Sequence, residues 1–112
     1  MDRIEWDDFA RVELRVGTII EVKAFPEARK PAWKVWVDFG ESVDVRKSSA
    51  QITDLYTADE LIGKQVVAVV NFPEKQIGPF KSQCLVTGFH RDNGAVVLAT
   101  PDSPVPNGAR LA

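Results

Sequence analysis

Apolar and polar side chains alternate between Arg11 and Lys23 over a length that few folds can accommodate. A period of two predicts a single long β-strand with one face in the core and the other in water. Gly17 lies in the middle of this stretch, and a glycine inside a strand is typical of a bulge or of the sharp bend at a barrel corner. The apolar positions are Val12, Leu14, Val16, Ile20 and Val22, and the polar positions are Glu13, Arg15, Glu21 and Lys23.

A second and a third strand follow a charged loop bracketed by Pro26 and Pro31. The second strand covers residues 33–39, where Val35, Val37 and Phe39 alternate with polar neighbours. The third begins near residue 43, after a turn at residues 40–41. We expect these two strands to form a hairpin.

The second half of the chain adds a helix and further strands. Thr57 and Glu60 have the spacing of a capping box and Gly63 is a typical helix end, so a short helix is predicted. An apolar fourth strand covers residues 64–72 and a polar connection residues 73–79. A fifth strand is predicted at residues 80–89 and a short sixth at residues 95–100.

This order predicts an all-β protein, namely a five-stranded OB-type Greek-key barrel with a short helix between strands 3 and 4. A small sandwich or another barrel fits the spacing nearly as well. The chain has 112 residues, which is the length of one domain.

Composition excludes several classes of protein. The chain has 14 Lys and Arg against 16 Asp and Glu, so indiscriminate coating of nucleic acid is excluded, although a local basic patch is not. Its single cysteine and single histidine can form neither an internal disulfide nor a Cys/His zinc site. The longest apolar run, residues 66–70, is too short to cross a membrane. We expect a cytoplasmic protein with no membrane insertion, metal or cofactor.

No catalytic motif is present. Cys84 and His90 are the only pair that suggests a nucleophile and a base, and no third group orients them. We therefore expect Cys84 to pack in the interior and His90 to lie in a surface loop. The chain is not expected to be an enzyme.

The two tryptophans of the second strand are three positions apart, so their side chains are predicted to point to opposite faces of the strand. Trp33 shares the parity of the apolar set, so it is predicted to point inward or to the barrel rim. Trp36 shares the parity of Lys34 and Asp38, so it is predicted to lie outside. An exposed Trp36 beside Lys34 would form an amphipathic patch for an extended guest peptide. The alternative is that a partner subunit or a terminal segment covers Trp36.

Basic residues gather in three places and suggest a phosphate-binding face if the barrel brings them together. A scatter of solvated charges is the alternative. The three groups are Arg29, Lys30 and Lys34; Arg46 and Lys47; and Lys75 and Lys81.

Three segments resemble the tRNA-binding domain family, which includes the domain appended to some methionyl-tRNA synthetases. They are residues 8–19 (DFARVELRVGTI), residues 61–72 (LIGKQVVAVVNF) and residues 80–83 (FKSQ). Three more are similar to its CsaA-type branch, small chaperones associated with protein export. These are residues 26–34 (PEARKPAWK), residues 47–52 (KSSAQI) and residues 101–108 (PDSPVPNG).

The resemblance implies an OB barrel extended at both ends, with residues 8–112 as the domain and residues 1–7 as an N-terminal extension. It also implies a homodimer made by the terminal segments. Implied partners are unfolded or precursor polypeptides, tRNA and the export motor protein. Residues expected at the dimer interface are Ile4, Trp6, Phe9, Val105 and Leu111.

Lys34, Asn71 and Ser82 match positions that contact RNA in the wider family. Cys84 and Leu85 stand where that family often has glycine and methionine. Strand parity predicts that Ser82 and Leu85 face opposite ways unless the strand bends. The residues expected to bind RNA or peptide are Lys34, Trp36, Arg46, Lys47, Asn71, Lys75, Lys81, Ser82 and Leu85.

Overall fold

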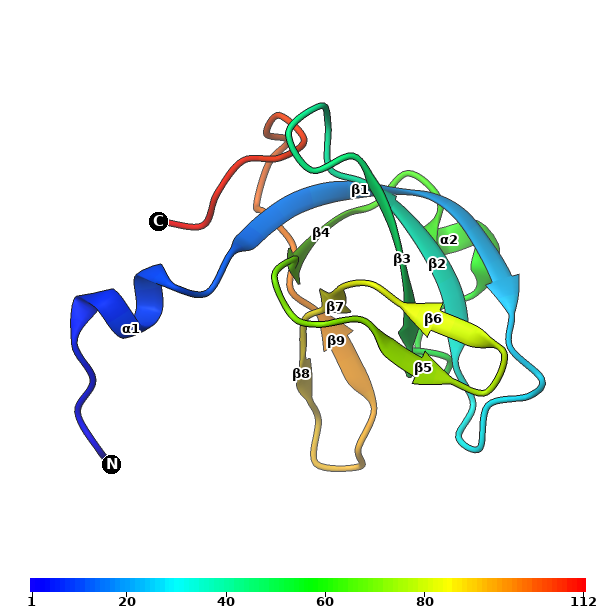
Figure 1. The fold of residues 1–112 in the computed structure, drawn as a ribbon. Coiled ribbons are helices and arrows are strands. Elements are labelled where there is room, and N and C mark those ends of the chain that lie inside the picture. The colour runs from blue at the N-terminus through cyan, green and yellow to red at the C-terminus, as the bar shows by residue number, and fades with distance from the viewer.

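A five-stranded antiparallel sheet curls into a nearly closed barrel in the computed structural model, which describes all 112 residues (Figure 1). The strand order is β3-β2-β1-β4-β7, and helix α2 (Ala58–Leu61) connects β3 to β4. The prediction of an all-β, OB-type barrel with a helix between the third and fourth strands is confirmed. The strands are β1 (Leu14–Ala24), β2 (Trp33–Asp38), β3 (Val45–Ala50), β4 (Gln65–Val69) and β7 (Leu85–Val86).

Two short hairpins pack beside the barrel, and one further helix stands away from it near the N-terminus (Figure 1). The sequence predicted only a polar connection at residues 73–79, which was wrong because these residues contain a strand, and the N-terminal helix was not predicted. The additional elements are α1 (Trp6–Ala10), the hairpin of β5 (Lys75–Ile77) with β6 (Phe80–Ser82), and the hairpin of β8 (Gly88–His90) with β9 (Val96–Leu98).

Strand β1 is long and bent, as its alternation predicted, but the bulge is not at Gly17. The pairing register between β1 and β2 shifts between Ile19 and Glu21. Consequently Ile19 is fully buried while Ile20, expected to point inward, is 49% exposed. Gly17 has another role: a Cβ atom there would lie 2.5 Å from Cγ1 of Val37, so the glycine allows β1 to approach the core closely.

The barrel interior is filled by the alternate apolar residues of β2 and β4 together with α2. Val35, Val37 and Phe39 are fully buried, as their parity predicted. Leu61 of α2 is also fully buried in this core. The helix begins at Thr57, whose hydroxyl accepts a hydrogen bond from the Glu60 amide, so the capping box is confirmed.

The predicted fifth strand at residues 80–89 is divided into three short strands. The chain leaves β6 at Gln83, whose amide donates to the Lys47 carbonyl of β3 at 2.8 Å. The Lys47 amide in turn donates to the Gln83 side-chain oxygen at 3.2 Å. These two bonds connect β3 to the segment after β6 on the side where the sheet does not otherwise close.

The C-terminal segment lies against the start of β1, while the N-terminal segment with α1 projects away from the barrel ahead of it (Figure 1). The Leu111 amide donates to the Leu14 carbonyl, and the Arg110 guanidinium donates to the Ala10 carbonyl. Glu13 bridges this region through ion pairs to Arg15 at 2.8 Å and to Arg110 at 3.0 Å. No helix of the chain has the length and apolar character needed to span a bilayer.

Candidate peptide and nucleic-acid interface

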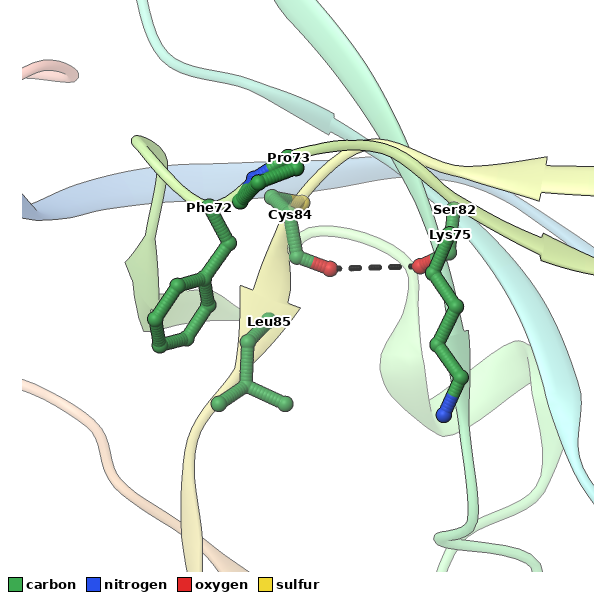
Figure 2. A pocket seen from close by; sticks show the side chains of 6 residues that line it. All are labelled: Phe72, Pro73, Lys75, Ser82, Cys84 and Leu85. Atoms are coloured by element: carbon green, nitrogen blue, oxygen red, sulfur yellow. Dashed lines mark hydrogen bonds between the residues drawn. The ribbon is translucent and has the colours of Figure 1, made fainter.

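An apolar pocket of about 330 Å³ lies between the end of β4 and the start of β7 (Figure 2). Phe72 and Leu85 point to the same side of it, and both are about half exposed, at 54% and 49%. Exposed apolar side chains around a hollow are typical of a binding site. The lining residues are Phe72, Pro73, Lys75, Ser82, Cys84 and Leu85.

This pocket opens into a larger hollow of about 870 Å³, and four lining residues are common to both. The larger hollow lies between the loop after β1, the end of β3 and the β5–β6 hairpin. We call the two hollows together the groove. Its larger part is more polar, and its charged lining residues are Arg29, Lys30 and Lys75 against Glu27.

Ser82 and Leu85 both line the apolar pocket, which is the outcome expected if the strand bends between them. The reason is the break between β6 and β7, where Gln83 and Cys84 leave the strand conformation. The Ser82 hydroxyl donates to the Cys84 carbonyl at 3.3 Å and holds this bend (Figure 2).

Cys84 is buried in the wall between pocket and core, as predicted. Burial raises the pKa of its thiol to about 12, which the charge of Arg46 and a hydrogen bond with Ser48 offset only in part. The thiol is therefore protonated at neutral pH and contributes an apolar surface to the pocket rather than a nucleophile.

A second surface, the basic aromatic face, covers the outside of β2 beside the β5–β6 hairpin. Lys34 Nζ lies 4.8 Å from the ring centroid of Phe25 and 5.5 Å from that of Phe80. Lys47 Nζ lies 5.1 Å from the Phe80 ring. Lys23 Nζ lies 5.3 Å from the Trp36 ring. Three ammonium groups thus lie over one aromatic cluster, which keeps them together on this face.

Trp36 lies outside the barrel core, but the prediction that it is exposed was wrong. Its side chain is half-buried and packs on the small cluster of Phe25, Ala32 and Phe80. The β5–β6 hairpin, rather than a terminal segment, covers it. Trp33 packs against the main core and donates its indole N–H to the Tyr56 carbonyl at 3.0 Å, as expected for a rim residue.

Three of the expected binding residues lie elsewhere. Arg46 pairs with inward-facing Val37 and donates to the Val70 carbonyl at 2.6 Å, so it closes the barrel end. The Asn71 side-chain oxygen accepts a hydrogen bond from the Glu13 backbone N–H, and its side-chain nitrogen donates to the Arg11 carbonyl. Asn71 therefore connects the segment before β1 to the end of β4. Lys81 alternates with Phe80 along β6 and lies 3.9 Å from Glu74, so it faces away from the basic aromatic face.

The terminal segments create a separate apolar hollow of about 260 Å³, which we call the terminal patch. Trp6 is 70% exposed and Leu111 47% exposed there, and nearby Ile4 is 70% exposed. Val105 is not part of it, because its backbone is bonded to the side chain of Gln65, which begins β4 opposite Thr18 in the middle of β1. The patch is lined by Trp6, Phe9, Ala10, Arg110, Leu111 and Ala112.

The sequence analysis did not identify Phe72 or Lys23 as site residues. Phe72 comes directly before Pro73 at the end of an apolar strand, and a large side chain at a strand end is a signal for a rim position. Lys23 lies two positions after Glu21 in the first strand, so the alternation predicts that both side chains point into water. Nothing local indicates that it lies over Trp36.

The chain matches the family described as "Putative tRNA binding domain" over residues 14–110. It is 33% identical over 110 residues to a methionine--tRNA ligase of Flavobacterium johnsoniae, and 38% identical over 108 residues to that of Pyrococcus abyssi. These alignments cover 98% and 96% of this chain but only 15% and 14% of the two ligases. The chain belongs to the tRNA-binding domain family.

Two solved structures match this chain from end to end. The chaperone CsaA of Bacillus anthracis superposes with a TM-score of 0.93 at 43% identity, covering 99% of this chain and 100% of that one. The CsaA chaperone protein of Picrophilus torridus gives a TM-score of 0.91 at 48% identity, with coverage of 98% and 100%. The chain is thus similar to CsaA chaperones over its whole length.

Proposed function

We propose that this protein is a non-enzymatic chaperone that binds extended segments of unfolded or precursor polypeptides in the groove. The observation that supports this most directly is that the groove joins an apolar pocket to a larger hollow lined by positive charges. An unfolded segment offers apolar side chains and charges in succession. A depression with both properties fits such a guest better than it fits a small polar substrate.

The apolar part of the groove supplies the affinity in this proposal. Leu85 and Phe72 are about half exposed, so a guest side chain placed between them removes apolar surface from water on both partners. Lys75 at the pocket margin and Arg29 and Lys30 farther along attract carboxylates of the guest.

Similarity to whole CsaA chaperones supports the same reading, because it extends over both the groove and the terminal segments. A role in protein export, with the export motor as a further partner, is the finer part of this proposal. We also propose that the protein is a homodimer whose contact is the terminal patch. Its exposed Trp6 and Leu111 would bury apolar surface against a second copy.

Introducing a charge into the apolar pocket tests the chaperone proposal. We expect Leu85→Asp to weaken the binding of a fluorescent, reduced and unfolded model polypeptide at least tenfold in an anisotropy titration. Ile20→Asp is the matched control, since Ile20 is equally exposed at 49% and does not line the groove. Equal binding by both variants would refute the proposed groove.

A second candidate function is tRNA binding on the basic aromatic face. Family membership and the convergence of Lys23, Lys34 and Lys47 over one aromatic cluster favour it. Lysines contribute phosphate contacts without reading sequence, and such contacts recognise the backbone and shape of folded RNA. With a net charge of −2, attraction must come from this local face.

A salt titration with tRNA tests this second function. If the three lysines each neutralise about one phosphate, log affinity should fall against log salt with a slope of about −2 to −3. Lys34→Glu combined with Lys47→Glu should abolish the binding. Lys81→Glu is the control, because Lys81 faces away and should change affinity little. Binding that is insensitive to salt would exclude this face.

A further inference from the structure

The outer edge of β3 is only partly used by the rest of the protein. Antiparallel pairing with β2 occupies one edge of β3, while Lys47 and Ser49 direct their backbone groups to the other edge. Both backbone groups of Lys47 bond to Gln83. The Ser49 amide has only a long contact of 3.4 Å to the Ser82 hydroxyl.

Beyond Lys47 this edge carries unpaired groups. The Ser49 carbonyl points to the same side as the Ser49 amide, because the N–H and C=O of one strand residue share an edge. No protein group donates to that carbonyl, and the Gln51 amide donates to no acceptor. Ser49 and Gln51 both line the larger hollow of the groove. The free backbone groups therefore face the depression in which the guest is proposed to bind.

We propose that the guest polypeptide binds by strand addition, pairing its backbone with the Ser49 carbonyl and the Gln51 amide. This inference rests on the proposed chaperone function and specifies how it is performed. One guest residue can donate its N–H to Ser49 and accept from Gln51 through its C=O, which is the pattern of a parallel pair. Backbone pairing gives affinity without regard to guest sequence, as a chaperone for many polypeptides requires.

Side chains of an added strand point alternately to two sides, and the groove has two different sides for them. The apolar pocket of Phe72 and Leu85 accepts a large apolar side chain. Arg29 and Lys30 on the loop after β1 present positive charge to the larger hollow. The guest that fits is thus an extended segment in which apolar and acidic residues alternate.

Two variants at Gln51 distinguish the contribution of its backbone N–H to guest binding from that of its side chain. Gln51→Pro removes the free N–H, and the Ile52 amide bonded to the Ala50 carbonyl forms a tight turn around residue 51 that suits the φ of proline. Gln51→Ala keeps the N–H. For a labelled heptapeptide of alternating leucine and glutamate, we expect Gln51→Pro to bind about tenfold more weakly than Gln51→Ala.

N-methylation of the same heptapeptide, one residue at a time, tests the pairing on the unchanged protein. Strand addition predicts that the methyl group at the residue opposite Ala50 weakens binding about tenfold, whereas methyl groups on its two neighbours do not. Equal affinities throughout the series, with Gln51→Pro binding like the parent, would overturn strand addition and leave the chaperone function standing. Failure of the unmethylated peptide and of unfolded polypeptide to bind at all would overturn both.

Discussion

Trp36 and Phe80 pack edge to face with their ring centroids 6.0 Å apart, which fixes the β5–β6 hairpin against the outside of β2. The same hairpin forms one wall of the groove. A contact on the basic aromatic face thus holds a wall of the neighbouring site in place, and a change at Trp36 should affect stability as well as binding.

We expect Trp36→Ala to lower the free energy of unfolding by about 2 kcal/mol, roughly half the cost of truncating a fully buried tryptophan. Urea denaturation followed by circular dichroism measures this change. Phe89→Ala is the control, because Phe89 is 69% exposed and its loss should change stability by less than about 0.5 kcal/mol. Unchanged stability of Trp36→Ala would mean that the hairpin does not depend on this contact.

Gly17→Ala should destabilise the barrel by about 1–3 kcal/mol through overpacking. A Cβ atom at this position would lie 2.5 Å from Val37 and 2.7 Å from Phe39, both fully buried. The midpoint of urea unfolding measures the effect. Glu21→Ala on the same strand is exposed and should leave the midpoint almost unchanged. Equal midpoints for the two variants would contradict the close approach at Gly17.

The molecular mass of the protein in solution tests whether the terminal patch is a dimer interface. We expect the intact protein to sediment at twice its chain mass of 12.4 kDa at micromolar concentration, and Trp6→Asp to sediment as a monomer. Phe89→Asp is a matched control, since Phe89 and Trp6 have nearly equal exposure at 69% and 70%. A monomeric parent protein, or dissociation by both variants alike, would refute the proposed interface.

Acid should release the C-terminal segment from β1. The hydrogen bond from Arg15, and then the charges of Arg110 and Arg15, lower the pKa of Glu13. Since the folded-state pKa is depressed, the stabilisation is present above the unfolded value of 4.5 and is lost as the pH falls through the folded value. NMR relaxation at Leu111 should report greater mobility at pH 3 than at pH 6.

Glu13→Gln is the control for this prediction. It removes the titrating carboxylate, so the C-terminal segment should be equally mobile at both pH values. A pH-dependent mobility that persists in Glu13→Gln would assign the effect to other carboxylates.

The sequence predicted the barrel because its signals are local. The alternation in β1 and β2 and the capping box of Thr57 and Glu60 each act within a few residues. The β5–β6 hairpin was missed because two prolines near residues 73–79 read as a loop. Its stability comes from Phe80, which packs on the distant residues Phe25 and Trp36.

The site was predicted only in part, since its geometry depends on where strands bend and pair. Ser82 and Leu85 share a pocket because of a break that parity does not reveal. Arg46 and Asn71 were expected to bind a ligand, but their polar groups satisfy main-chain groups of Val70, Glu13 and Arg11. Distant main-chain acceptors and donors leave no signal near these residues in the sequence.

Gln83 connects β3 to the segment after β6 through two hydrogen bonds. Its backbone amide donates to the Lys47 carbonyl, and its side-chain oxygen accepts from the Lys47 amide. Besides these two bonds, the seam has only the longer contacts from the Ser49 amide to Ser82 and from the Cys84 thiol to the Lys47 carbonyl as backbone-directed hydrogen bonds, so it should open at a lower free energy than the rest of the sheet. When it opens, the exposed edge of β3 extends from Ser49 back to Lys47. A guest strand that already pairs at Ser49 can then extend its pairing to Lys47 by replacing the hydrogen bonds of Gln83. The protein should therefore bind long segments more tightly than short ones.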